Sequence, residues 1–284
     1  MSEKQSMKKP ILVIGGMGKT GRRVVERLAE RGIPSRIGSR SSELPFDWQN
    51  RSTWAPILEN VEAVFISYYP DLAMPGAADD IRTLAKLALA KGIRRLVLLS
   101  GRGEAGALAS EQALQNSGAD WTIVRASWFS QNFSESFLLD SVLSGTIALP
   151  IGDVTEPFID AEDIADVAVA ALTEEGHTEQ LYELTGPRLL TFAQVTEEIA
   201  LASKRDIAYV PITKEQFVGG LEEQNLPVDF TNLLIQLFTH VLDGRNSYLT
   251  DGVQRALGRE PRDFSDYAQE VAKTGIWDQV QSNE

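Results

Sequence analysis

Residues 11–21 read Ile-Leu-Val-Ile-Gly-Gly-Met-Gly-Lys-Thr-Gly, and this stretch decides the fold of the chain. Its first four residues are apolar, as expected for a parallel strand that is covered on both faces of a sheet. A glycine-rich turn follows and opens an amphipathic helix from Lys19 to about Arg31. Strand, turn and helix in this order predict the start of a βαβ unit that binds a dinucleotide.

The glycines of this turn are spaced three apart, as G-x-x-G-x-x-G. Such glycines permit a tight turn, let a pyrophosphate approach the backbone and let the helix pack closely on the strand. The free N–H groups at the start of the helix then bind phosphate oxygens. The phosphate loop of ATPases is disfavoured because Val13 stands where that motif needs a glycine. The predicted phosphate-binding residues are Gly15, Gly18, Lys19, Thr20 and Gly21.

A second strand is predicted at 35–38, and its end indicates which cofactor is preferred. NAD enzymes usually place Asp or Glu at this point, against the ribose 2′-hydroxyl. Here Ser39 and Arg40 stand, followed by Ser41 and Ser42. A guanidinium with hydroxyl groups beside it can bind a 2′-phosphate, which a carboxylate would repel. We therefore predict NADPH as the cofactor, bound by Ser39 and Arg40; the alternative is that Arg40 is a solvated surface residue.

Composition limits the class of protein. The chain has 284 residues, of which 43% are hydrophobic, which is enough for a large core. Its net charge of −13 opposes binding to nucleic acid. There is no cysteine, and the two histidines, His177 and His240, suggest no metal site. Residues 1–10 lack the apolar run of a signal peptide, and no segment approaches the ~20 apolar residues of a membrane span. We expect a cytoplasmic protein.

Strand and helix patterns alternate through the first half of the chain, which predicts an α/β fold with a Rossmann-type doubly wound parallel sheet. We expect a flexible N-terminus at 1–10 and a dinucleotide-binding core at 11–145. Residues 146–284 would supply the final strands and a smaller, mainly helical substrate-binding cap within one compact unit. Predicted strands lie at 11–14, 35–38, near Phe46, and at 63–67, 95–99, 121–125, 146–149, 158–160 and 181–185. Predicted helices lie at 19–31, 77–90, 162–172, 192–203, 214–224, 229–242 and 263–273.

Ligands of open parallel sheets bind outside the carboxyl ends of the strands. Tyr68, Tyr69 and Ser100 follow or end predicted strands, so they point toward the cofactor by topology. The apolar residues between Phe230 and Val241 recur at helical spacing, which is typical of core packing more often than of a substrate wall.

Residues 121–133 read Trp-Thr-Ile-Val-Arg-Ala-Ser-Trp-Phe-Ser-Gln-Asn-Phe. They resemble the T-x-x-R-x-x-x-F-x-x-N stretch of the NmrA-like, atypical short-chain dehydrogenase/reductase family. Gly-Lys-Thr-Gly-Arg-Arg at 18–23, Gly-Ser-Arg at 38–40 and Phe-Asp-Trp at 46–48 are closest to one branch. This branch is the ergot-alkaloid agroclavine dehydrogenase (festuclavine synthase) group with its bacterial relatives. The resemblance covers nearly the whole chain.

The resemblance implies an NADPH-dependent oxidoreductase that transfers hydride to an activated small-molecule acceptor, such as an imine or iminium, a quinone or an enone. None of the six tyrosines is followed by lysine four residues later, so the Tyr-x-x-x-Lys dyad of carbonyl reductases is absent. An iminium carbon already carries positive charge. Its reduction needs positioning and a dry pocket but no obligatory acid.

The resemblance also implies site residues. Ser100 would contact nicotinamide or substrate, Glu111 would stabilise a cationic substrate or relay a proton, and Tyr68 would pack beside the nicotinamide or donate a hydrogen bond. Glu111 could equally be a solvated helix residue. The implied catalytic residues are Ser100, Glu111 and Tyr68. Further implied cofactor contacts are Asp47, Tyr68 and Ser100. Implied substrate residues are Tyr69, Trp128, Phe129 and Asn132, of which Trp128 and Phe129 could equally be core.

The alternative function is a non-catalytic, NADP(H)-binding redox sensor, because regulators occur in the NmrA-like family and the dyad is absent. Sugar epimerisation or dehydration is disfavoured because such enzymes generally keep the dyad. The expected partner is a small-molecule substrate, with no nucleic acid, membrane or metal. A homodimer, the acceptor, the proton donor and the stereochemistry are left open.

Overall fold

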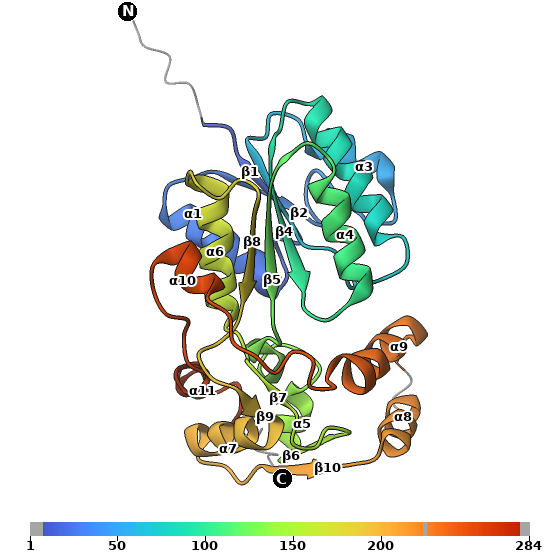
Figure 1. Cartoon of the computed structure of the whole chain (residues 1–284), viewed down its shortest axis with the longest axis vertical. Helices are drawn as coiled ribbons and strands as arrows, with labels where there is room; N and C mark the ends of the chain where they lie inside the picture. The colour runs from blue at the N-terminus through green and yellow to red at the C-terminus, as the bar shows by residue number, and fades with distance from the viewer. Residues whose placement is uncertain (1–7, 224–225, 279–284) are drawn as a thin grey trace, which may run out of the picture. The chain divides into compact units, whose positions relative to one another are not determined.

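A computed structural model describes residues 8–223 and 226–278 (Figure 1). Contacts divide the chain into two compact units. The first unit holds the chain up to Ala126, Glu162–Glu183 and Gly252–Gly258. The second unit holds the remaining residues. Most of the predicted flexible terminus at 1–10 lies outside the described residues.

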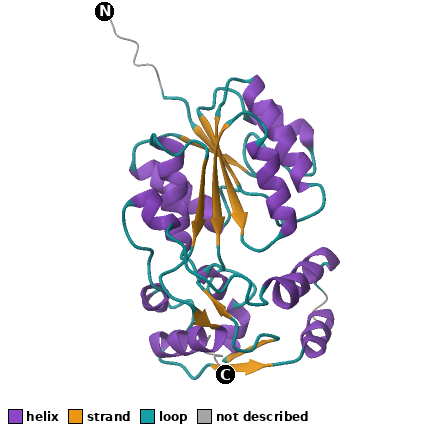
Figure 2. Ribbon diagram, viewed as in Figure 1, coloured by secondary structure: helices purple, strands orange, loops and turns teal. Residues whose placement is uncertain are grey.

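The first unit is built on a six-stranded sheet with the order β2-β1-β3-β4-β5-β8. The register is parallel between β1 and β2, β1 and β3, β3 and β4, and β4 and β5. Figure 2 shows these strands as one twisted sheet. The bounds are β1 Ile11–Ile14, β2 Ser35–Gly38, β3 Ala63–Ile66, β4 Arg95–Gly101, β5 Asp120–Ala126 and β8 Gln180–Leu184. The predicted Rossmann-type parallel sheet is confirmed.

Helices cover both faces of this sheet: α1 and α6 lie on one side, α3 and α4 on the other (Figure 1). Arg23 and Arg27 of α1 pair with Glu162 of α6, and Arg27 also pairs with Asp166. The helices are α1 Lys19–Glu30, α2 Trp54–Ile57, α3 Ala77–Ala90, α4 Ala105–Gln115, α6 Ala161–Thr173 and α10 Gly252–Leu257, with a short 3-10 turn η1 at Arg51–Thr53. The helices predicted with bounds omit α4, although one interpretation of Glu111 placed that residue on a helix; the alanine-rich stretch carries no clear apolar stripe.

The strand predicted near Phe46 is wrong. This segment is a loop that contains only an isolated bridge between Asp47 and Asn50. Its aromatic side chains pack edge to face: the ring of Trp48 lies 4.8 Å from that of Phe46 and 5.4 Å from that of Trp54. Rings that pack together in this way bury the apolar surface that suggested a strand.

The second unit has small sheets and helices around an aromatic core. β6 (Thr146–Leu149) pairs in parallel with β10 (Ala208–Pro211), and β7 (Thr155–Glu156) is antiparallel to β9 (Leu190–Thr191). The helices are η2 Ser130–Phe133, α5 Leu139–Ser144, α7 Phe192–Ser203, α8 Lys214–Glu223, α9 Val228–Gln236, the π-helical turn η3 Leu237–Val241, and α11 Phe264–Lys273. Leu234, Phe238 and Val241 are buried, as core packing requires.

One expectation for the second half of the chain differs from the structure. No strand forms at 158–160, because Ile159 makes only an isolated bridge to Phe129. Most of α6 and β8 belongs to the first unit, since β8 completes the parallel sheet beside β5. The division at residue 145 stays a prediction.

Candidate functional site

The turn after β1 requires glycine at two positions. Gly15 has a φ of +75°, in the left-handed region that favours glycine. The Gly18 N–H donates to the Gly15 carbonyl at 2.9 Å, which closes the turn. A Cβ on Gly21 would stand 2.1 Å from the Gly15 oxygen, so only glycine lets α1 pack this closely on the turn. Two of the predicted glycines are therefore needed for the backbone itself.

The start of α1 offers donors to an anion. Gly18 caps the helix without a side-chain hydrogen bond, and no acidic residue occupies its first turn. The Thr20 hydroxyl is buried and has no hydrogen-bond partner among the described residues. A buried polar group of this kind normally has a partner. The positive dipole end of the helix and the buried Thr20 hydroxyl fit the phosphates of a dinucleotide.

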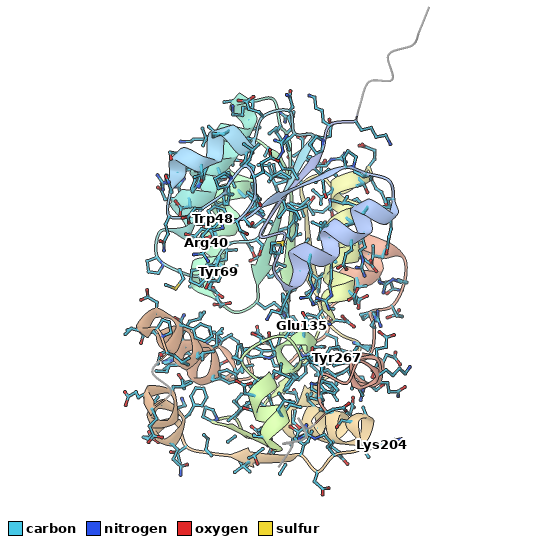
Figure 3. The ribbon with its side chains drawn as sticks, turned by 180° about the vertical axis from the view of Figure 1, so that it is seen from behind. Arg40, Trp48, Tyr69, Glu135, Lys204 and Tyr267 are labelled. Carbon is cyan, nitrogen blue, oxygen red and sulfur yellow. The ribbon has the colours of Figure 1, made fainter. Side chains whose placement is uncertain are left out.

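The end of β2 carries a second group of donors. The Ser39 hydroxyl lies 2.8 Å from that of Ser42 and 3.3 Å from that of Ser41. Arg40 is exposed, and no carboxylate in the described part of the chain pairs with it. Its guanidinium carbon stands 5.9 Å from the centre of the Tyr69 ring, and Figure 3 shows the two side chains together. Guanidinium and hydroxyl groups are the kinds of donors that bind phosphate oxygens.

Asp47, a predicted cofactor contact, is a turn residue in this structure. Its Oδ1 accepts a hydrogen bond from the Gln49 N–H at 3.0 Å, and its carbonyl accepts one from the Trp54 indole at 2.7 Å. These bonds hold the loop after β2 and leave the second carboxylate oxygen for other partners.

Tyr68 follows β3, and its hydroxyl forms a hydrogen bond within the first unit. The hydroxyl donates to Asp80 Oδ2 at 2.7 Å, and the ring lies 4.4 Å from that of Trp48. Burial, and next the hydrogen bond to the Asp80 carboxylate, raises the pKa of Tyr68 well above its ordinary value. A phenol that binds its proton more tightly is a weaker acid. The geometry thus favours packing for Tyr68 over proton donation.

The structure brings Ser100 and Glu111 together. The Ser100 hydroxyl donates to Glu111 Oε1 at 2.6 Å, and Arg125 of β5 donates to both oxygens of Glu111 at 2.9 and 2.5 Å. Arg125 also contacts Glu183 at 3.1 Å. Glu111 is buried, so its interpretation as a solvated helix residue is wrong. The hydrogen bond and charge of Glu111 raise the pKa of Arg125, although burial opposes this.

Sequence reasoning missed a second buried acid at this edge of the sheet. Glu104 lies just after β4 and is 8% exposed. Burial, and next repulsion from Asp71, raises the pKa of Glu104 to about 8. A signal was present in the sequence: Glu104 comes five residues after the carboxyl end of the central strand predicted at 95–99, and ligands of such sheets bind at that end.

The predicted substrate residues fall in both units. Tyr69 belongs to the first unit and is exposed. Trp128, Phe129 and Asn132 belong to the second unit. The Trp128 ring packs against those of three phenylalanines, Phe137, Phe192 and Phe238, at 5.1–6.3 Å. Its indole N–H is buried without a hydrogen-bond partner in the described structure, which leaves a donor at an aromatic wall.

Two negative findings concern the described residues alone. They contain no group of three or more His, Cys, Asp and Glu side chains that could hold a metal ion. They also contain no helix that is long and apolar enough to span a membrane. The cytoplasmic location stays a prediction. Whether the protein forms a homodimer stays an open question.

Comparison with known proteins places the chain in a family. The family described as NAD(P)H-binding matches residues 15–175, which is more than half of the chain. The uncharacterized oxidoreductase YesF of Bacillus subtilis is 31% identical, over 94% of this chain and 96% of its own length. Agroclavine dehydrogenase of Claviceps fusiformis is 31% identical, over 94% of this chain and 98% of its own length. NAD(P)H azoreductase of Xenophilus azovorans is 31% identical, over 91% of this chain and 96% of its own length.

Solved structures share the fold. The NADPH-dependent quinone oxidoreductase QOR2 of Escherichia coli, in complex with NADPH, gives a TM-score of 0.77 at 19% identity, over 92% of this chain and 99% of that one. NmrA, a negative transcriptional regulator in complex with NAD, gives a TM-score of 0.71 at 16% identity, over 95% of this chain and 97% of that one. The fold thus occurs in both reductases and regulators, and does not distinguish between them.

Proposed function

The chain belongs to the NAD(P)H-binding family, and from this premise we propose that it is an NADPH-dependent reductase. The proposed reaction transfers hydride to an activated small-molecule acceptor, such as an iminium, a quinone, an enone or an azo compound. The observation that carries the proposal is the uncapped start of α1, where the Thr20 hydroxyl is buried without a described partner. A ligand with phosphate oxygens would satisfy that group.

NADPH is proposed over NADH because of the end of β2. Arg40 is exposed and has no carboxylate partner in the described part of the chain, and the hydroxyls of Ser39, Ser41 and Ser42 lie close to one another at the same strand end. A 2′-phosphate is anionic and can accept charge-assisted hydrogen bonds from such a group. A 2′-hydroxyl is neutral and can form only ordinary hydrogen bonds with it. Lys19 and the glycines of the turn would hold the pyrophosphate.

The bound cofactor would supply hydride; the chain itself binds and positions the reactants. Ser100 stands at the end of β4, with its hydroxyl oriented by Glu111. Since Arg125 occupies both oxygens of Glu111, we assign Glu111 the role of positioning Ser100. In the second unit, the Trp128 N–H and the surrounding rings would suit a flat acceptor that carries a hydrogen-bond acceptor. Phe129, Asn132 and Tyr69 remain proposed substrate contacts.

The test is consumption of NADPH by the purified protein with a panel of cyclic iminium ions, quinones, enones and azo compounds, with NADH run beside it. We expect turnover with NADPH. Arg40→Ala should weaken NADPH binding about 10- to 100-fold, as the loss of a charged hydrogen bond predicts, and affect NADH little. The matched control is Lys86→Ala, an exposed cation on α3. Equal losses for both cofactors would contradict the assignment of Arg40.

The second candidate is a redox sensor that binds the dinucleotide without turnover. It is favoured by the shared fold with NmrA and by the absence of a Tyr-x-x-x-Lys dyad. Tight binding of NADPH with no turnover of any acceptor would support the sensor and overturn the reductase.

A further inference from the structure

Two carboxylates outside the predicted site converge at the carboxyl edge of the sheet. Asp71 lies in the loop after β3, and Glu104 lies in the loop after β4. These strands are parallel neighbours, with Ile66 opposite Leu98, so both loops leave the same edge. Ligands of parallel sheets bind at this edge.

Close packing holds the two loops together. A Cβ on Gly106, at the start of α4, would stand 2.2 Å from the Ala73 carbonyl oxygen. The Ser110 hydroxyl donates to the Leu72 carbonyl at 3.1 Å. The segment that carries Asp71 is thus fixed against the first turns of the helix that follows Glu104, and the two carboxylates keep their spacing.

The Glu104 carboxyl group is buried and incompletely bonded. The residue is 8% exposed, and no described residue forms a hydrogen bond with its Oε2. Its Oε1 stands 2.7 Å from the place where a Cβ on Gly101 would lie. The side chain therefore folds back over Gly101 at the end of β4. An isolated carboxylate is costly in such a place, and the neutral acid is favoured.

The charges around Glu104 do not offset this cost. From the β3 loop it faces Asp71, whose Oδ1 accepts the Ala73 N–H at 2.7 Å. On its own loop, Arg102 is paired with Glu183 at 3.0 Å. On β5, Arg125 is held by Glu111 and Glu183. Burial raises the pKa of Asp71 as well, so the two carboxyl groups together favour holding a proton near neutral pH.

We propose that Glu104 is the proton donor of the reaction, and that Asp71 is a positioning residue that keeps Glu104 protonated. This rests on the proposed reductase function. The acceptor gains a bond to hydride at its electrophilic atom, and the π electron pair moves to the oxygen or nitrogen at the other end. That atom takes the proton as the O–H bond of Glu104 breaks. The resulting carboxylate then takes up one H⁺ from the solvent, so that each turnover consumes one hydride and one proton.

The donor would serve neutral acceptors, namely quinones, enones and azo compounds. Each of these develops negative charge on oxygen or nitrogen as hydride arrives, so a proton must follow. A cationic iminium becomes a neutral amine by hydride transfer alone. Comparing a neutral acceptor with an iminium therefore distinguishes an effect on proton donation from an effect on cofactor binding or hydride transfer.

The first measurement is infrared difference spectroscopy of the cofactor-free protein as the pH is raised from about 6 to about 10. We expect the C=O stretch of a protonated carboxyl group near neutral pH, its loss at higher pH, and its absence in Glu104→Gln. Asp71→Asn should lower the pH at which the band disappears, because it removes a negative neighbour. A merely structural Asp71 would leave that pH unchanged. Glu62→Gln, an exposed acid, is the control.

The second measurement compares kcat for a neutral and an iminium acceptor. Glu104→Gln should lower kcat for the neutral acceptor about 100- to 10,000-fold, the usual contribution of a general acid, and leave the iminium rate and the Kd for NADPH nearly unchanged. Glu104→Asp keeps an acid and should recover part of the loss. Circular dichroism verifies that each variant is folded.

The outcomes separate the two proposals. A wild-type protein that binds NADPH and reduces no acceptor overturns the reductase, and the donor with it. If the wild type is active, three results each overturn the donor alone: no carboxyl band near neutral pH, equal kcat for Glu104→Gln and wild type with the neutral acceptor, or equal losses with both acceptors. A band together with a loss confined to the neutral acceptor supports the donor.

Discussion

Two buried glutamates flank the first half of α4, and their surroundings differ. Glu111 has both oxygens bonded, to Arg125 and Ser100. Glu104 has one oxygen with no hydrogen-bond partner among the described residues and faces a second acid, Asp71. The first arrangement stabilises a charge, whereas the second disfavours one. Burial alone therefore does not identify a reactive carboxyl group; its hydrogen bonds and neighbouring charges do.

The largest expected effect comes from removing the partner of Glu111. Arg125→Met leaves a buried carboxylate without its cation, which should lower the free energy of unfolding by about 3–5 kcal/mol. Urea denaturation measures this. The matched control is Arg94→Met, which breaks the exposed pair with Asp120 and should change stability little. If the two variants lose equally little, Glu111 is not held as a charged group and the contrast with Glu104 disappears.

The next effect has the opposite sign and depends on pH. Glu104 in the native state holds its proton up to about pH 8, against an ordinary value of 4.5. The native state thus binds more protons than the unfolded state between these values, and stability falls as the pH rises through them. Glu104→Gln should match the wild type near pH 5 and exceed it by several kcal/mol near pH 9.

Denaturation at the two pH values checks this prediction, with Glu62→Gln as the exposed control. A constant difference between Glu104→Gln and the wild type at both pH values would mean that Glu104 titrates normally.

Ser100→Ala should have a smaller effect. It removes one of the bonds to Glu111 and leaves Arg125 in place, so a loss of about 2 kcal/mol in unfolding free energy is expected. In a double-mutant cycle with Glu111→Gln, the two changes should be strongly non-additive, because they remove the same bond. Simple additivity would show that the 2.6 Å contact contributes nothing.

The smallest effect is expected for Tyr68→Phe. The change removes the bond to Asp80 and should cost about 1 kcal/mol. With Glu104 as proton donor, kcat for a neutral acceptor should stay within a few-fold of the wild type. A loss as large as that of Glu104→Gln would assign the proton to Tyr68 instead.

The regular parts of the fold could be predicted because their signals are local. The glycine turn, β1 and α1 follow from spacing within 20 residues, and the NAD(P)H-binding family and the Rossmann-type sheet are confirmed. The segment at Phe46 failed because aromatic residues suit a strand and a packed ring cluster equally well, and contacts with Trp48 and Trp54 decided between them. The roles of the predicted site residues stay predictions.

The sequence by itself determined where the chain turns, which strands are buried and which loops end at the carboxyl edge of the sheet, because these depend on neighbours along the chain. Only the tertiary structure decided which of the two carboxylates pairs with a cation. Arg125 reaches Glu111 from a neighbouring strand, and Asp71 reaches Glu104 from a loop 33 residues earlier in the chain. The ionisation of a buried acid depends on charges and hydrogen bonds close in space, which spacing along the sequence does not specify.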